Sequence, residues 1–144
     1  MTIGNVTISP GAAASFAVTM SGTGVVGTEN DITFDGVGTP IAVVAGHPDC
    51  TGATNKPASF VFYPLGCVGS ACTRVRAVLV SQGNITAIPS GATLYTCRVR
   101  VPPGTGGGTR PLVASNLVLS DKSGNAVSAT KTDGSVTVPG GGCL

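Results

Sequence analysis

Charged side chains are scarce in this chain of 144 residues: Asp, Glu, Lys and Arg together make up only 10% of it. A globular domain usually has about 25%. The eight basic residues are spread along the chain, and the formal net charge is only +2. Binding to nucleic acid and anchoring to anionic membranes both depend on dense basic clusters. The sequence therefore argues against both functions.

Long apolar runs are also missing. No run approaches the ~18 residues needed to cross a membrane, and residues 1–4 lack the basic and apolar regions of a signal peptide. Disordered chains are poor in apolar residues, whereas 42% of this sequence is hydrophobic. Length and composition predict one folded domain over residues 1–138, followed by a glycine-rich tail over residues 139–144.

Residue types that carry catalysis are few. His47 is the single histidine, and no G-x-S-x-G motif offers it a nucleophile. Glu29, Asp31 and Asp35 form the only acidic cluster, and on one continuous strand they would share a face. Such a face could bind a cation or supply a general acid, as in a glycosidase, but a solvated strand face is the favoured interpretation. We expect no enzymatic activity and no cofactor.

Short runs of Val, Thr, Ile and Phe, separated by glycine and proline, make up most of the chain. These residue types favour strands, and Phe16, Val18 and Met20 alternate with small or polar residues, as on a half-buried strand. Strands are expected over residues 2–9, 15–21, 25–35, 41–45, 59–63, 73–81, 93–101, 112–120 and 135–138. The pattern predicts an all-β sandwich, with a closed barrel as the less favoured alternative.

Five segments, in order along the chain, carry a family resemblance. They are TIGNVTISPGAAASFAVTMSG, GVVGTENDITFDG, IPSGATLYTCRVRVPPGTGGGTRPL, VLSDKSGNAV and DGSVTV. Together they resemble the cohesin family, the nine-stranded jelly-roll modules best known from cellulosome scaffolds and also found in other bacterial and archaeal surface proteins. The resemblance implies a nine-stranded jelly-roll β-sandwich. The cysteines and the low charge depart from cellulosomal cohesins, so no dockerin-contact residue is transferred to this chain.

Four of the five cysteines lie within the expected domain, and four cysteines allow three pairings. The resemblance makes the strands around Cys67 and Cys72 neighbours and places the strand before Cys50 beside the strand of Cys97. It thus implies the disulfides Cys67–Cys72 and Cys50–Cys97, with Cys50–Cys67 plus Cys72–Cys97 as the alternative. A zinc site, to which His47 could contribute, is less favoured because only Cys67 and Cys72 are close in sequence. Disulfides favour an extracellular or cell-surface location.

The fifth cysteine, Cys143, follows three glycines near the end of the tail. An unpaired cysteine in a secreted protein favours pairing with another molecule. We therefore expect Cys143 to act in intermolecular disulfide formation or in anchoring.

Asp121, Ser123 and Asn125 have the alternate spacing of a calcium-binding loop. The downstream glutamate of an EF-hand is missing, and Asp-x-x-Gly-Asn is also an ordinary hairpin turn. The turn is the favoured interpretation, and the calcium site is a weak candidate.

Four arginines alternate along two of the expected strands: Arg74, Arg76, Arg98 and Arg100. They could form one basic patch that binds a carboxylate or an acidic glycan. The favoured interpretation is that they occupy the solvent side of two amphipathic strands.

Aromatic residues make up only 4% of the chain, and tryptophan is missing. Sugar-binding modules usually present several aromatic rings for stacking, so Tyr63 and Tyr95 are the only glycan-contact candidates. The leading hypothesis is a non-catalytic extracellular module that associates with a protein partner or with further copies of itself. In its extreme form it is a self-assembling subunit of a surface filament or layer. The alternative is a carbohydrate-binding module, which would bind polysaccharide, in a larger secreted enzyme or adhesin.

Overall fold

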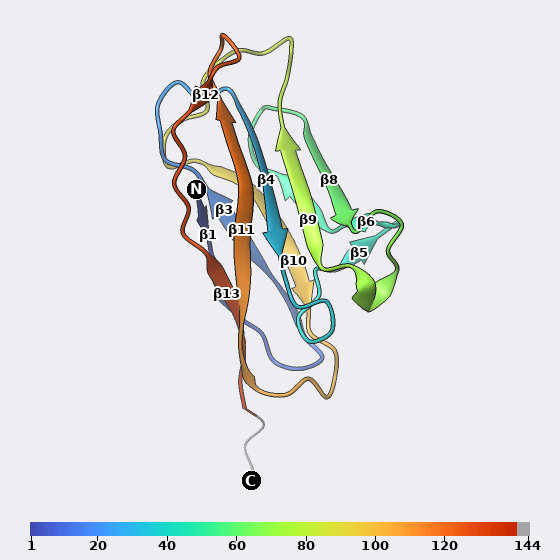
Figure 1. Ribbon diagram of the computed structural model, residues 1–144. Helices are drawn as coiled ribbons and strands as arrows, with labels where there is room; N and C mark the ends of the chain where they lie inside the picture. Colours follow the sequence, from blue (N-terminus) through green and yellow to red (C-terminus); the bar gives the residue numbers. More distant parts are fainter. Residues whose placement is uncertain (141–144) are drawn as a thin grey trace.

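The computed structural model describes residues 1–140, so Cys143 lies outside the described part of the chain. Strands and one short 3-10 helix, η1 (Gly69–Ala71), account for its regular structure (Figure 1). The strands are β1 (Thr2–Ile3), β2 (Asn5–Thr7), β3 (Ala13–Thr19), β4 (Gly27–Thr33), β5 (Val43–Val44), β6 (His47–Pro48), β7 (Cys50–Gly52), β8 (Ala58–Tyr63), β9 (Arg74–Leu79), β10 (Thr93–Arg100), β11 (Gly108–Ser120), β12 (Ala126–Val127) and β13 (Gly134–Val138). Residues 1–140 contain no helix with the length and hydropathy that a membrane crossing requires.

Two sheets pack face to face as a sandwich (Figure 1). The first has the order β1-β3-β10-β7. The second has the order β2-β13-β11-β4-β9-β8, with β12 paired to β11. Strands β13 and β2 pair in parallel, whereas the other pairs in these two sheets are antiparallel.

The first expected strand divides at Gly4, so that β1 joins one sheet and β2 joins the other. The chain passes close to β3 at this point, because a Cβ atom on Gly4 would lie 3.0 Å from the carbonyl oxygen of Ala17. Only glycine makes such a close backbone approach without displacing its neighbour. The division lets the N-terminal segment close both layers of the sandwich.

The core lies between the two sheets and is built from alternate residues of the long strands. In β9, Val75, Ala77 and Leu79 point inward and are at most 1% exposed, while their neighbours are half-buried. Strand β10 contributes Cys97 and Val99 from the facing sheet, both fully buried. This period of two is what the sequence pattern predicts for strands with one buried face.

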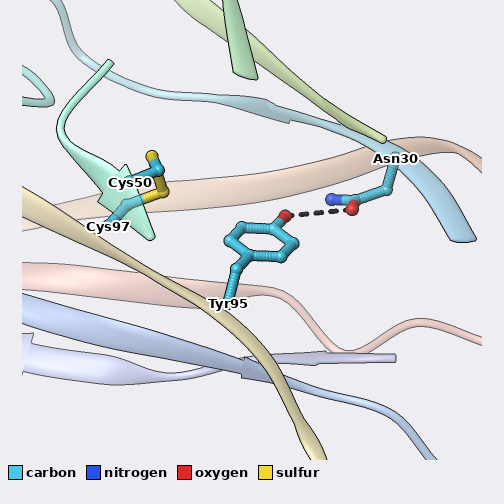
Figure 2. Close-up of a disulfide and its surroundings, with 4 residues drawn as sticks. All are labelled: Asn30, Cys50, Tyr95 and Cys97. Atoms are coloured by element: carbon cyan, nitrogen blue, oxygen red, sulfur yellow. Dashed lines mark hydrogen bonds between the residues drawn. A yellow bond between two sulfur atoms is a disulfide. The ribbon is translucent and has the colours of Figure 1, made fainter. Parts of the chain in front are cut away.

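Two disulfides join cysteines within the domain. Cys50 of β7 is bonded to Cys97 at its register partner position on β10 (Figure 2). Cys67 is bonded to Cys72 across the turn that contains η1. These are the pairs that the family resemblance implies. All four sulfur atoms are therefore engaged in covalent bonds, which leaves none of them as a thiolate for zinc.

Candidate interaction surface

Four strands, β8, β9, β4 and β11, lie side by side in the second sheet (Figure 1). We call the surface formed by their outward side chains the outer face. Direct pairing between the strands arranges these side chains in rows. The rows are Tyr63–Arg74–Thr33–Val113, Val61–Arg76–Asp31–Ser115 and Ser59–Val78–Glu29–Val118. The outer face therefore combines aromatic, guanidinium and aliphatic groups within a few strand spacings.

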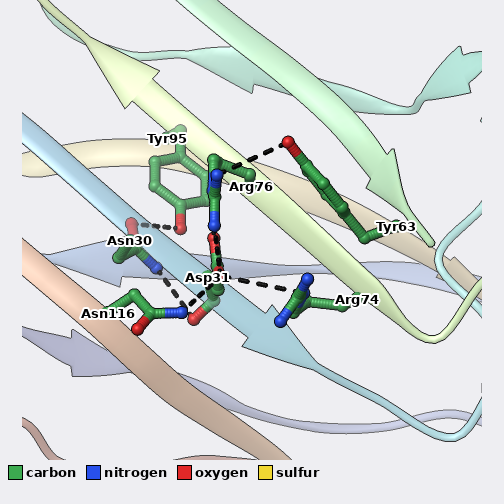
Figure 3. A network of polar contacts seen from close by, with 7 residues as sticks. All are labelled: Asn30, Asp31, Tyr63, Arg74, Arg76, Tyr95 and Asn116. Carbon is green, nitrogen blue, oxygen red and sulfur yellow. Dashed lines mark hydrogen bonds and ion pairs between the residues drawn. The ribbon is translucent and has the colours of Figure 1, made fainter. Parts of the chain in front are cut away.

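Asp31 points to the outer face, yet its side chain is fully buried (Figure 3). Arg76 donates two hydrogen bonds to it, from Nε to Oδ1 at 2.8 Å and from Nη2 to Oδ2 at 3.1 Å. Asn116 donates a third, from Nδ2 to Oδ2 at 2.8 Å. The Nε atom of Arg74 is 3.7 Å from Oδ2, an ion-pair contact. The arginines, whose side chains are 33% and 37% exposed, thus cover the carboxylate.

The pKa of the Asp31 carboxyl reflects two opposing effects. Burial alone raises it, because the charged form loses its hydration. The hydrogen bonds from Arg76 and Asn116, together with the positive charges of Arg76 and Arg74, outweigh burial and hold the pKa below its ordinary value. The hydrogen bonds and the negative charge of Asp31 in turn raise the pKa of Arg76. Asp31 is therefore an ionised acceptor, unsuited to act as a general acid near neutral pH.

A bulge in β11 positions Asn116. The register with β4 shifts between Ser115 and Val118, and Asn116 has a φ angle of 51°. Asparagine tolerates this left-handed conformation better than most residues, and a bulge redirects a side chain. Sequence reasoning missed Asn116, and its only signal is a single amide among the aliphatic and small residues 111–120.

Tyr63 lies beside both arginines (Figure 3). The Cζ atoms of Arg74 and Arg76 are 4.9 Å and 4.8 Å from the centre of its ring, within the range of cation–π contact. Next to them is a hollow of about 280 Å³, which we call the Arg74 hollow, lined by Thr33, Tyr63, Pro64, Thr73 and Arg74. The hollow lies where β8 ends and β9 begins.

A larger pocket, of about 600 Å³, lies at one end of the sandwich. Its lining is mostly apolar and includes Phe34, Ile41 and Phe62, with Arg100 as the single ionisable residue. General acid–base catalysis needs a proton donor and acceptor in reach of the substrate. The pocket supplies neither.

Comparison with known proteins relates the chain to others by fold. No family model matches the sequence, and no curated protein matches it. A type I cohesin from Pseudobacteroides cellulosolvens superposes with a TM-score of 0.75 at 14% identity, covering 99% of this chain and 93% of that chain. A cohesin from a Clostridium thermocellum cohesin–dockerin complex gives 0.74 at 8% identity, covering 96% and 91%. A non-cellulosomal cohesin from the archaeon Archaeoglobus fulgidus gives 0.69 at 14% identity, covering 95% and 88%.

The chain has a cohesin-like fold. This confirms the predicted cohesin-like jelly-roll sandwich. Several residues predicted as sites nevertheless occupy other positions in the cohesin-like domain than the sequence pattern led us to expect.

The acidic cluster does not form one face. Glu29 and Asp31 project from β4 as expected, but β4 ends at Thr33 and Asp35 lies in the following loop. There its Oδ1 accepts hydrogen bonds from the backbone N–H groups of Val37 and Gly38. These hydrogen bonds, led by that of Gly38, hold the pKa of Asp35 below its ordinary value despite partial burial. The expectation of a shared face was wrong because the side chain of Asp35 turns the chain after the strand.

The four arginines belong to opposite sheets of the cohesin-like domain. Arg74 and Arg76 lie on the outer face of β9, and Arg98 and Arg100 are exposed on β10. One basic patch of all four is therefore wrong, since the sandwich core separates the two pairs.

Tyr95 cannot contact a glycan, because it is fully buried between the sheets (Figure 2). Its hydroxyl donates a hydrogen bond to Oδ1 of Asn30 at 2.9 Å, and its ring packs edge-on against Phe60 at a centroid distance of 5.3 Å. Burial raises the pKa of the phenol. The glycan-contact expectation for Tyr95 was wrong, because the inward face of β10 needs a large apolar ring and Asn30 satisfies its hydroxyl.

Asp121 closes the turn between β11 and β12. Its Oδ1 accepts hydrogen bonds from the backbone N–H groups of Ser123 and Asn125, each at 2.9 Å. The carboxylate thus stabilises the hairpin in the way a turn-forming aspartate does. His47 is exposed in the short β5–β6 ribbon. In the described range 1–140, His, Cys, Asp and Glu side chains do not gather in groups of three that could hold a metal ion.

Proposed function

We propose that this cohesin-like domain is a non-catalytic extracellular module that acts by protein–protein association through the outer face. The observation that carries the proposal is the composition of that face. Arginine and tyrosine are enriched among residues that dominate binding energy at protein interfaces, and Tyr63, Arg74 and Arg76 lie together there. Val61 and Val118, 39% and 46% exposed, add apolar surface at either side.

Three further observations support the proposal. A cohesin of the same fold from Clostridium thermocellum was solved in complex with a dockerin, which is a protein partner. The apolar pocket at one end of the sandwich lacks an acid–base pair. The two disulfides suit an oxidising compartment.

Self-association is the stronger form of the proposal. In it, copies of the chain assemble into a surface filament or layer, and Cys143 links neighbouring copies through a disulfide. The support comes from the sequence, which places an odd cysteine in a glycine-rich tail. Non-reducing electrophoresis of the full chain should show oligomers that disappear with reductant and in Cys143→Ser. A monomer in every lane would contradict the covalent link.

The role of the outer face is tested by sedimentation velocity on Cys143→Ser, alone and with the dockerin of the Clostridium thermocellum complex as probe. We expect Cys143→Ser to associate either with further copies of itself or with the dockerin. Adding Val61→Arg/Val118→Arg, the double variant, should abolish that association. Val44→Arg is the matched control, because Val44 is a 55% exposed valine on the β5–β6 ribbon outside the outer face. Association that survives in the double variant, or is lost equally in the control, would contradict the proposal.

Polysaccharide binding remains a second candidate on Tyr63 alone, whose ring is half-buried at the edge of the Arg74 hollow. Polysaccharide pull-down that is lost in Tyr63→Ala but kept in Tyr63→Phe would support stacking on this ring. Equal retention in both variants would remove the candidate.

A further inference from the structure

We infer that the Arg74 hollow binds a carboxylate side chain, Asp or Glu, presented by the protein partner. The inference rests on the proposed function, because it names the chemistry by which the outer face would recognise that partner. It depends on how differently Arg74 and Arg76 are engaged within the domain.

Arg76 is already committed to Asp31. It donates from Nε and Nη2 to the two carboxylate oxygens, and its Nη1 donates to the hydroxyl of Tyr63 at 3.4 Å. This is the two-pronged geometry in which guanidinium and carboxylate bind most strongly. Three of the five N–H donors of Arg76 are thus engaged within the domain.

Arg74 is positioned by the ring of Tyr63, but its Nε–H group has no hydrogen-bond acceptor among the described residues. Its Nε is buried and has no hydrogen-bond partner within residues 1–140, and its distance of 3.7 Å to Asp31 is too long for a hydrogen bond. The ring of Tyr63 lies 4.9 Å from its Cζ atom and orients the guanidinium plane. The terminal nitrogens belong to a side chain that is 37% exposed at the wall of the hollow. A partner could therefore bind an oriented guanidinium at little cost in side-chain entropy.

The charges around the hollow favour an anion. Two guanidinium groups share Asp31, the single carboxylate within ion-pair distance of either among the described residues. Glu29 lies one row away, paired in register with Val78 and Val118. The hydroxyl groups of Thr33 and Thr73 add hydrogen-bond donors at the same hollow. A planar carboxylate matches the positive charge and the fork of donors on Arg74, whose ion-pair contact with Asp31 is 3.7 Å long.

A protein carboxylate fits the surroundings better than the uronate of an acidic polysaccharide. Sugar recognition usually uses several stacking rings, and Tyr63 is the single aromatic residue in the rows of the outer face, within residues 1–140. Its neighbours there include Val61 and Val113, as expected for an interface with a protein.

The inference can be tested by NMR titration of the ¹⁵N-labelled full chain with the peptide acetyl-Gly-Glu-Gly-amide, and with its Gln counterpart. The Glu peptide alone should shift the Nε–Hε signal of Arg74 and the ring signals of Tyr63. Its affinity should fall about tenfold or more in Arg74→Gln. Arg74→Lys should retain part of the affinity, because it keeps the charge and loses the fork. Arg98→Gln, which removes the same charge from the opposite sheet, should bind as the unchanged chain does.

Three results would overturn the inference. The first is equal shifts with the Glu and Gln peptides. The second is equal loss of affinity in Arg74→Gln and Arg98→Gln, which would indicate an effect of net charge. The third is an Arg74-dependent shift with polygalacturonate and none with the Glu peptide, which would assign the hollow to acidic glycan. Spectral dispersion of each variant reports whether it is folded.

Failure of the inference can be told apart from failure of the proposed function. If Val61→Arg/Val118→Arg abolishes partner association and Arg74→Gln leaves it unchanged, the carboxylate assignment is wrong and the outer face still binds. If association survives in the double variant, the proposed function is wrong whatever the peptide shows.

Discussion

Asn30 and Asp31 are consecutive residues of β4 that are both fully buried, but they are buried by different means. Asn30 faces the opposite sheet and pairs with the hydroxyl of Tyr95 (Figure 2). Asp31 faces outward and is covered by Arg74, Arg76 and Asn116 (Figure 3). The Asn30 amide is buried between the two sheets, whereas the Asp31 carboxylate is buried beneath side chains that are partly exposed at the surface.

The Asn30–Tyr95 pair is therefore a structural site, whereas the region around Asp31 is suited to binding. The Asn30–Tyr95 pair lies in the core near the Cys50–Cys97 disulfide, where water cannot replace a lost partner. Arg74 and Arg76, which cover Asp31 together with Asn116, have partly exposed side chains that water or a partner can reach. We therefore expect changes in the interior region to lower stability, and changes on the outer face to affect stability less and binding more.

The largest effect should come from the interior disulfide. Cys50→Ala/Cys97→Ala opens a loop with a sequence separation of 47, and loop-closure entropy predicts a loss of about 4 kcal/mol in the free energy of unfolding. Cys67→Ala/Cys72→Ala is the matched control with a separation of 5, for which we expect about 2 kcal/mol. Urea denaturation of both variants measures the difference. Equal losses would show that loop length does not govern the contribution of these bridges.

The second effect concerns the carboxylate under the arginines. Asp31→Asn leaves two guanidinium groups around a neutral amide and should cost about 1–3 kcal/mol. The cost stays below that of a fully enclosed pair because the arginine side chains are partly exposed to water. Asp133→Asn removes the charge of a surface pair with Lys131 at 3.2 Å and keeps an amide oxygen that can accept the backbone N–H of Ala114, so it should cost about 0–1 kcal/mol. If the two variants unfold at the same urea concentration, the cover of Asp31 has no special role in stability.

A matched pair of tyrosine variants compares the two regions directly. Tyr95→Phe leaves the buried amide of Asn30 without its donor and should cost about 1–2 kcal/mol. Tyr63→Phe keeps the ring beside the arginines and should stay within about 0.5 kcal/mol of the unchanged chain. Thermal unfolding of both proteins measures the effect. A larger loss for Tyr63→Phe would reverse the proposed division between interior and outer face.

The smallest effect should appear in acid. The folded-state pKa of Asp31 is lowered from its ordinary value of 3.8, so its contribution to stability is complete above that pH and is lost as the pH falls through the folded-state pKa. The stability difference between the unchanged chain and Asp31→Asn should therefore be constant near neutral pH and should shrink below about pH 4. Denaturation midpoints across this range provide the measurement. A difference that grows in acid would mean that the pKa of Asp31 is raised.

Local pattern was enough to predict most of the strands. The expected strands 59–63, 73–81 and 93–101 correspond closely to β8, β9 and β10, because alternation and turn residues are local signals. The predicted strand 25–35 continued two residues past the end of β4 at Thr33. That error placed Asp35 on the wrong surface, since alternation does not reveal where an aspartate begins to bind backbone N–H groups.

The sequence by itself determined that the chain forms a low-charge β-sandwich with paired cysteines, because strand alternation, turns and the order of motifs can be read directly from it. The tertiary structure alone decided which polar residues are buried and by what. Asp31 receives its hydrogen bonds from residues 45 and 85 positions away, and Tyr95 finds Asn30 at a separation of 65. Such partners meet only when strands from distant parts of the chain pair and the two sheets close. Asp31, expected on a solvated strand face, is a covered ion-pair residue in the fold, and Tyr95, a glycan-contact candidate, is a core residue.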